Sequence, residues 1–138
     1  MWLLGTDMYC LDTDVLIDYL RGNKQVFEKL SFFFTHGIGL FTTFINVCEL
    51  YKGVYLSKKK DKEEGEVRSL IDTVKPIGMD HYSCTFFGKE WSRLQKEGKT
   101  TQILDLMIAS VAVANNLTLI TKNRRHYENI AGLKIEEI

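Results

Sequence analysis

The chain has few of the residues that mark zinc-binding or secreted proteins. It contains one proline, three cysteines and three histidines in 138 residues. The cysteines Cys10, Cys48 and Cys84 are far apart, no Cys-x-x-Cys pair is present and the histidines are scattered, which argues against a zinc site. An odd number of cysteines among apolar neighbours instead predicts buried, reduced thiols in a cytoplasmic protein.

Long apolar runs and an excess of either charge are also absent. No segment approaches the roughly 20 apolar residues that span a bilayer, so we expect no membrane contact. Residues 1–5 are too few for the apolar part of a signal peptide and lack a basic flank. Because the formal net charge is +0, contact with nucleic acid would require a local basic patch. The length and the 45% hydrophobic content predict one domain over residues 1–138.

Apolar patterns of strand and helix type alternate along the chain. Strands separated by helices predict an α/β fold with a parallel sheet covered on both faces. Helices 44–56 and 105–114 are apolar nearly all round, which predicts that both are fully covered. The charged stretch Ser57 to Glu66 predicts a solvated helix end and loop. The predicted strands are 8–11, 37–41, 74–77, 118–120 and a short edge strand 134–135, and the predicted helices are 13–21, 24–34, 44–56, 64–73, 82–96 and 105–115.

Four polar residues end or interrupt these apolar segments. Asp12 and Asn123 each follow a short predicted strand, Glu49 lies in the middle of an apolar helix, and Asp105 opens another. A carboxylate in apolar surroundings costs folding energy unless something offsets it. Ligands of open parallel sheets bind beyond the carboxyl ends of the strands, so Asp12 and Asn123 are expected at the same edge.

Each acid also has a purely structural explanation. Asp12 and Asp105 could cap the helices that follow them, although Thr13 could cap the first equally well. Glu49 could pair with Lys52, three residues later on the same helix.

Convergence of the acids would create a problem of like charge. Two carboxylates about 4 Å apart repel by roughly 4 kcal/mol at an effective dielectric constant near 20. Three would take up protons or collect a cation. Oxygen ligands without cysteine or histidine favour Mg²⁺ or Mn²⁺ over zinc, and such ions commonly serve phosphate chemistry. Asp14, in the first turn of its helix, could be a direct ligand, a support for one, or simply an acid favoured by the helix dipole.

Cations cluster next to Asn123. Lys122, Arg124 and Arg125 would suit contacts with a phosphate backbone, although the two arginines could be ordinary surface charges. His126 has no histidine partner suggested by the sequence and stays unassigned.

The ordered set of motifs resembles the PIN-domain family, in particular the VapC-type toxin ribonucleases of type II toxin–antitoxin systems. The motifs are Leu-Asp-Thr-Asp-Val-Leu-Ile-Asp at 11–18, Glu-Leu-Tyr-Lys-Gly-Val at 49–54, Asp-Leu-Met-Ile-Ala-Ser at 105–110 and Leu-Ile-Thr-Lys-Asn at 119–123, followed by 124–127. This resemblance implies a three-layer α/β/α sandwich around a central parallel sheet. It also implies an endoribonuclease that cleaves RNA with Mg²⁺ or Mn²⁺ in an acidic pocket.

The resemblance also implies roles for individual residues and for partners. Asp12, Glu49 and Asp105 would bind the metal and, with Asn123, form the catalytic pocket. Supporting contacts would come from Asp14 and from the hydroxyl groups of Thr13 and Thr121. The family typically forms homodimers and is silenced by a cognate antitoxin, which is a separate chain. Many members carry Asp where this chain has Asn123, and a neutral amide attracts a metal more weakly. One metal is therefore expected, and the occupancy of a second is left open.

Two other functions compete with this hypothesis. A catalytically weak PIN-like binding module would explain the neutral Asn123. A haloacid-dehalogenase phosphatase is suggested by Asp12-x-Asp14, but its further acidic element late in the chain is absent and Glu49 would have no role.

Overall fold

The computed structural model describes residues 8–138, which form a five-stranded parallel sheet between two layers of helices. The expectation about residues 1–5 therefore lies outside the described residues. The strands have the spatial order β3-β2-β1-β4-β5, and every neighbouring pair is parallel. Their bounds are β1 (Met8–Leu11), β2 (Gly39–Thr43), β3 (Lys75–Ile77), β4 (Thr118–Thr121) and β5 (Lys134–Glu137).

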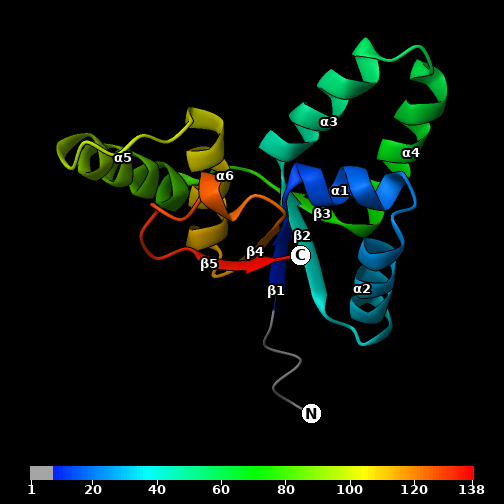
Figure 1. Ribbon diagram of the computed structural model, residues 1–138, viewed down its shortest axis with the longest axis horizontal. Coiled ribbons are helices and arrows are strands. Elements are labelled where there is room, and N and C mark those ends of the chain that lie inside the picture. Colours follow the sequence, from blue (N-terminus) through cyan, green and yellow to red (C-terminus); the bar gives the residue numbers. More distant parts are fainter. Residues whose placement is uncertain (1–7) are drawn as a thin grey trace.

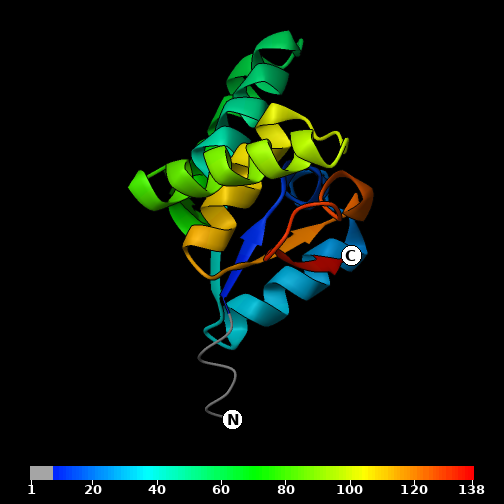
Figure 2. The same cartoon turned by 90° about the vertical axis from the view of Figure 1, so that its left-hand side faces the viewer.

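Helices cover both faces of this sheet (Figures 1 and 2). One face carries α1 (Thr13–Leu20), α2 (Lys24–Thr35) and α4 (Lys60–Thr73), and the other carries α5 (His81–Lys96) and α6 (Ile103–Ala114). Helix α3 (Phe44–Leu56) leaves the end of β2 and forms a hairpin with α4. The predicted α/β/α sandwich is confirmed.

The central strand β1 contributes to two separate apolar cores. Leu11 packs with Leu16 and Leu30 in one core, whereas its neighbour Cys10 packs with Leu106 and Leu119 in the other. Successive side chains of a strand point to opposite faces of the sheet. Because helices cover both faces, the consecutive residues Cys10 and Leu11 are both buried.

The order of the strands places a topological switch point between β1 and β4. From β1 the chain adds β2 and β3 on one side, then crosses back to add β4 and β5 on the other. Leu11 pairs with Ile120, and the backbone N–H of Asp12 donates to the Ile120 carbonyl at 3.0 Å. Open parallel sheets bind ligands beyond the carboxyl ends of strands at such a point.

Three predicted element boundaries are wrong in an informative way. Strand β2 begins at Gly39, two residues later than predicted, because Gly37 (φ 67°) is still part of the turn that ends α2. Helix α4 begins at Lys60, four residues before the predicted start at residue 64, within the stretch predicted as a solvated helix end and loop. Asp61 and Glu63 lie in its first turn, where the helix dipole favours acids. Helix α6 begins at Ile103 rather than at residue 105.

Two expectations about burial are also wrong. Helix α3 is not fully covered, because Phe44, Tyr55 and Leu56 are 52%, 56% and 80% exposed. Of the cysteines only Cys10 is buried, and Cys48 and Cys84 are exposed. Among residues 8–138, every helix falls short of the length and apolar content that a membrane crossing needs.

A buried acid ties α5 to the loop that precedes β5. The Glu90 carboxylate accepts from Arg93 Nε at 2.8 Å and Nη2 at 2.6 Å, and from the Ala131 backbone N–H at 2.7 Å. The same Arg93 Nη2 donates to the Asn129 carbonyl at 2.8 Å. Glu90 is 5% exposed, so these donors replace the water that its charge has lost.

We predict that Glu90→Ala lowers the free energy of unfolding by about 1–3 kcal/mol, since the Ala131 N–H loses its partner and Arg93 loses a bidentate acceptor. Urea unfolding would measure this loss. Glu97→Ala is the matched control, because Glu97 binds the same Arg93 from an exposed position. Equal losses in the two variants would contradict the anchoring role of Glu90.

Candidate active site

Asp12 lies at the centre of a hydrogen-bond network at the switch point. It lies between the end of β1 at Leu11 and the start of α1 at Thr13, and it is 7% exposed. Its Oδ1 accepts from the Thr13 N–H at 2.9 Å and from Asn46 Nδ2 at 3.1 Å, and its Oδ2 accepts from Thr121 Oγ1 at 2.8 Å. Asp12 is therefore the N-cap of α1 by position, but β4 and α3 also hold it.

Glu49 joins this network through Thr13. The Thr13 hydroxyl donates to Glu49 Oε1 at 2.5 Å and accepts from Asn46 Nδ2 at 2.9 Å. Lys52, the alternative partner, forms no ion pair with Glu49 among the contacts of residues 8–138.

Asn46 links α3 to both residues and was missed in the sequence. It is completely buried, and its side chain also forms a capping box with Thr43 at the start of α3. The spacing Thr-x-x-Asn was the available signal, because it places a buried amide one turn before Glu49.

Asp14 and Asn123 face each other across the switch point. Asp14 Oδ2 accepts from Asn123 Nδ2 and from the Lys122 backbone N–H, each at 3.1 Å. Thr121 Oγ1 lies 3.4 Å from the same oxygen, although its hydroxyl proton has the shorter contact with Asp12. The other oxygen of Asp14, Oδ1, is buried without a hydrogen-bond partner.

Asp105 comes from α6, on the other face of the sheet. It lies in the first turn, whereas Gln102 occupies the cap position, so capping does not explain Asp105. Its Oδ1 accepts from the Tyr127 hydroxyl at 3.5 Å, which is long for such a bond, and its Oδ2 lies 3.5 Å from His126 Nδ1. Tyr127 is almost completely buried. It was assigned no role from the sequence, although residues 124–127 were counted with the last motif.

The negative charge of Asp12 acts on both Asp14 and Asp105. Burial and the negative charge of Asp12 raise the pKa of Asp14 above its ordinary value. Burial raises the pKa of Asp105 as well; the charges of Asp12 and Glu49 add to this effect, and His126 opposes it. The pKa of Tyr127 is raised by burial and then by Asp12, Asp105 and Glu49, so its phenol stays a neutral donor.

The carboxylates are gathered, but they do not form a ready-made metal site. Within residues 8–138, no group of three or more His, Cys, Asp or Glu side chains is arranged so that it could hold a metal ion. Three observations nonetheless fit a hard divalent cation: the partnerless Asp14 oxygen, the raised pKa values of two acids, and a donor set made only of oxygen. The assignment of Asp12, Glu49 and Asp105 as ligands stays a prediction.

The three cations next to Asn123 differ in their contacts. Lys122 Nζ binds Asp18 Oδ2 at 2.6 Å, and Arg124 Nη2 donates to the Ile135 carbonyl at 3.1 Å. Arg125 is exposed in a short 3₁₀ turn, η2 (Arg124–His126). Their contact with a phosphate backbone stays a prediction.

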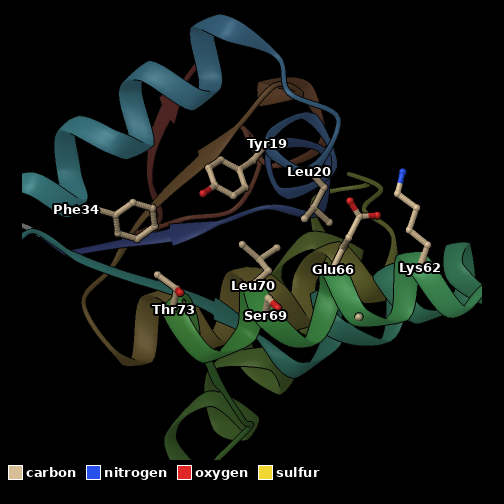
Figure 3. A pocket seen from close by; sticks show the side chains of 9 residues that line it. Tyr19, Leu20, Phe34, Lys62, Glu66, Ser69, Leu70 and Thr73 are labelled. Atoms are coloured by element: carbon tan, nitrogen blue, oxygen red, sulfur yellow. The ribbon is translucent and has the colours of Figure 1, made fainter.

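Two hollows lie beside α1. One lies between α1, α2 and α4, where Tyr19, Phe34 and Leu70 line it together with polar residues of α4, and it contains none of the predicted site acids (Figure 3). The second lies between α1 and the hairpin of α3 and α4, and Glu49 forms part of its wall. Both positive and negative side chains line the second hollow, so its charge does not indicate a ligand.

Comparison with known proteins gives a consistent result. The family model described as PIN domain matches residues 9–133. The chain is 30% identical over 132 residues to Ribonuclease VapC1 of Haemophilus influenzae strain R2866, covering 94% of this chain and 97% of the relative. It is also 30% identical over 127 residues to Ribonuclease VapC1 of Methanocaldococcus jannaschii, covering 91% and 84%. The structure of VapBC2 from Rickettsia felis, bound to a promoter DNA fragment, superposes with a TM-score of 0.88 at 24% identity, covering 95% and 98%.

We predict that Asp105→Asn is more stable than the wild type at neutral pH without divalent cations. The raised pKa means that the folded state holds a proton on Asp105 more tightly than the unfolded chain does. Ionisation of Asp105 therefore lowers stability as pH rises through its native pKa, and asparagine removes that loss. Thermal unfolding from pH 7 downwards should show the advantage of the variant shrinking and then vanishing. An advantage that stays constant with pH, or a less stable variant at pH 7, would contradict this account.

Proposed function

The chain belongs to the PIN-domain family, and we propose that it is a ribonuclease that hydrolyses RNA phosphodiester bonds with the help of a divalent cation. The observation that carries the proposal is that hydrogen bonds from Asn46 and Thr121 hold the buried Asp12 carboxylate at the switch point. There the charge of Asp12 acts on Asp14 and Asp105, which come from different parts of the chain. The similarity to proteins named ribonuclease supports RNA as the substrate.

Asp12, Glu49 and Asp105 would hold the cation, and oxygen ligands of this kind suit Mg²⁺ or Mn²⁺. When bound, such an ion lowers the pKa of a coordinated water and offsets charge on the phosphoryl oxygens. The carboxylates would have to shift to close around it, because their present arrangement does not form a metal site.

The neutral residues of the network would orient the ligands. Thr121 and Asn46 keep the two oxygens of Asp12 in separate directions, and Thr13 fixes one oxygen of Glu49. Hydrogen bonds to metal-binding carboxylates typically change metal affinity or activity by about 10–100-fold when they are removed. Lys122, Arg124 and Arg125 would contact RNA phosphates at the same edge of the sheet.

We further propose that the protein is the toxin of a toxin–antitoxin pair, inhibited by a separate antitoxin chain, and that it forms a homodimer. The similarity to VapC ribonucleases and the resemblance of the four motifs support this role. The exposed apolar side chains Phe44, Tyr55 and Leu56 on α3 are the kind of surface that protein partners cover.

We predict that Asp12→Asn, Glu49→Gln and Asp105→Asn each reduce RNA cleavage by at least about 100-fold while the fold stays intact. Each change removes a cation ligand but keeps the size of the side chain. Cleavage of tRNA, rRNA and mRNA pools, with Mg²⁺, Mn²⁺ or EDTA, would measure the effect, and circular dichroism would check the fold. Asp72→Asn, on the exposed surface of α4, is the control and should cleave normally.

The outcomes also separate the competing functions. Cleavage that persists in EDTA, or in any of the three variants, would contradict the proposal. A phosphorylated Asp12 would select the phosphatase instead. Tight binding of a partner without cleavage under any cation would select the binding module.

A further inference from the structure

We propose that the turn between α3 and α4 is a second RNA-binding surface, which holds phosphates of the substrate at a distance from the bond that is cut. The proposal rests on the proposed function, because it takes RNA as the substrate. Four exposed residues carry it, and we call them the lysine cluster: Lys58, Lys59, Lys60 and Lys62. Residues 57–62 together line a hollow of their own.

The first support is the charge of the cluster. Residues 57–62 contain four lysines and one aspartate, so their formal charge is +3 in a chain whose net charge is zero. Among residues 8–138, no ion pair includes any of the four lysines. Two of the acids that follow have other partners, because Glu63 accepts from the Ser57 hydroxyl at 2.9 Å and Glu64 pairs with Arg68 at 3.8 Å. The lysines therefore keep their ammonium groups available for a ligand.

The second support is that local stability does not explain these lysines. Lys59 occupies the cap position of α4, where its side chain forms no hydrogen bond, since a lysine offers no acceptor to the helix N–H groups. Lys58, Lys59 and Lys60 also place positive charge at the helix end that is itself positive. Departures from local preference that nothing nearby compensates are expected at functional sites. A bound phosphate would offset the repulsion between these charges.

The third support is the position of the cluster relative to the predicted pocket. Helix α3 begins where β2 ends, at the edge of the sheet where Asp12 lies, and the turn after α3 is at the far end of the hairpin from the sheet (Figure 1). From Glu49 to the end of α3 at Leu56 the distance along the helix is about 10 Å. Glu49, Lys59 and Lys62 also line the same hollow between α1 and the hairpin. An RNA strand bound at Glu49 is therefore within reach of the cluster.

The chemistry of lysine determines what the cluster contributes. An ammonium group on a flexible stem binds phosphate as a point charge, and such contacts position the strand without reading its sequence. Each contact with single-stranded nucleic acid makes the affinity more sensitive to salt, by about 0.7 in the slope of log affinity against log salt concentration. Because the cluster binds substrate and transition state alike, it should lower KM and leave kcat unchanged.

The test measures binding of a labelled single-stranded RNA by fluorescence anisotropy, in EDTA and over a range of salt concentrations. The variant combines Lys59→Gln with Lys60→Gln. We expect its affinity at low salt to fall by about 10-fold and the salt slope to become shallower by about 1.4, which corresponds to two lost phosphate contacts. Lys58→Gln combined with Lys62→Gln should behave alike, and it decides the matter if the first variant does not fold.

The matched control combines Lys89→Gln with Lys96→Gln, which removes two charges from exposed positions of α5 that form no ion pair within residues 8–138. Its affinity should stay within about twofold of the wild type, because charges more than a Debye length from the RNA are screened. Equal losses in the control and the cluster variants would reduce the effect to general electrostatics and overturn the proposal. Unchanged affinity and salt slope in both cluster variants would overturn it as well.

A polyglutamate peptide of similar length distinguishes RNA from an acidic protein partner. Wild-type protein that binds this peptide as tightly as the RNA, with the same loss in the cluster variants, would assign the surface to such a partner and overturn the proposal. With Mn²⁺ present, the cluster variants should raise KM for RNA and keep kcat within about twofold of the wild type. A lower kcat at unchanged KM would also overturn it.

The binding measurement separates this inference from the proposed function. A wild type that binds RNA through the cluster but cuts none with any divalent cation would refute the proposed function and leave the binding surface standing. A wild type that cuts RNA, with cluster variants that bind and cut it equally well, would refute this inference alone.

Discussion

The hydrogen bonds that hold Asp12 between β1 and β4 are the interaction on which the rest of the site depends. Thr121 comes from β4 and Asn46 from α3, and both donate to the Asp12 carboxylate. Since Asp12 is thereby fixed and buried, its negative charge acts on Asp14 in α1 and on Asp105, which α6 brings to this edge of the sheet. The raised pKa values of Asp14 and Asp105 follow from that arrangement and from their own burial.

The donors that organise the pocket are mostly neutral, and this choice has a chemical consequence. Hydroxyl, amide and backbone N–H groups orient carboxylates without cancelling their charge. A lysine or arginine in the same place would satisfy the oxygens and also neutralise the pocket. The neighbouring Lys122 directs its ammonium group to Asp18 instead, and only its backbone N–H binds Asp14. The hydrogen bonds that orient Asp12 and Asp14 therefore leave the negative charge of these carboxylates unpaired by a directly bound ammonium or guanidinium group.

Much of this arrangement could be predicted from the sequence because it follows from strand ends. Asp12 and Asn123 follow apolar runs, and parallel strands bring such positions to one edge whatever the details of packing. The sequence could not show which polar groups meet there, because that depends on the register of β1 against β4 and on the angle of α3. Asn46 and Tyr127 were missed for this reason. From the sequence alone, a buried amide or phenol that belongs to a polar site cannot be distinguished from one that belongs to the core. The starts of α4 and α6 were misplaced because local helix propensity decides them within a few residues.

We propose that one divalent cation is shared by the carboxylates of Asp12, which directly follows β1, Glu49 in α3 and Asp105 in α6. Anomalous diffraction from crystals soaked in Mn²⁺ would test this claim most directly. It predicts a manganese peak within coordination distance of the carboxylates of Asp12, Glu49 and Asp105. A peak at another place on the protein, or none at Mn²⁺ concentrations that support RNA cleavage, would contradict it.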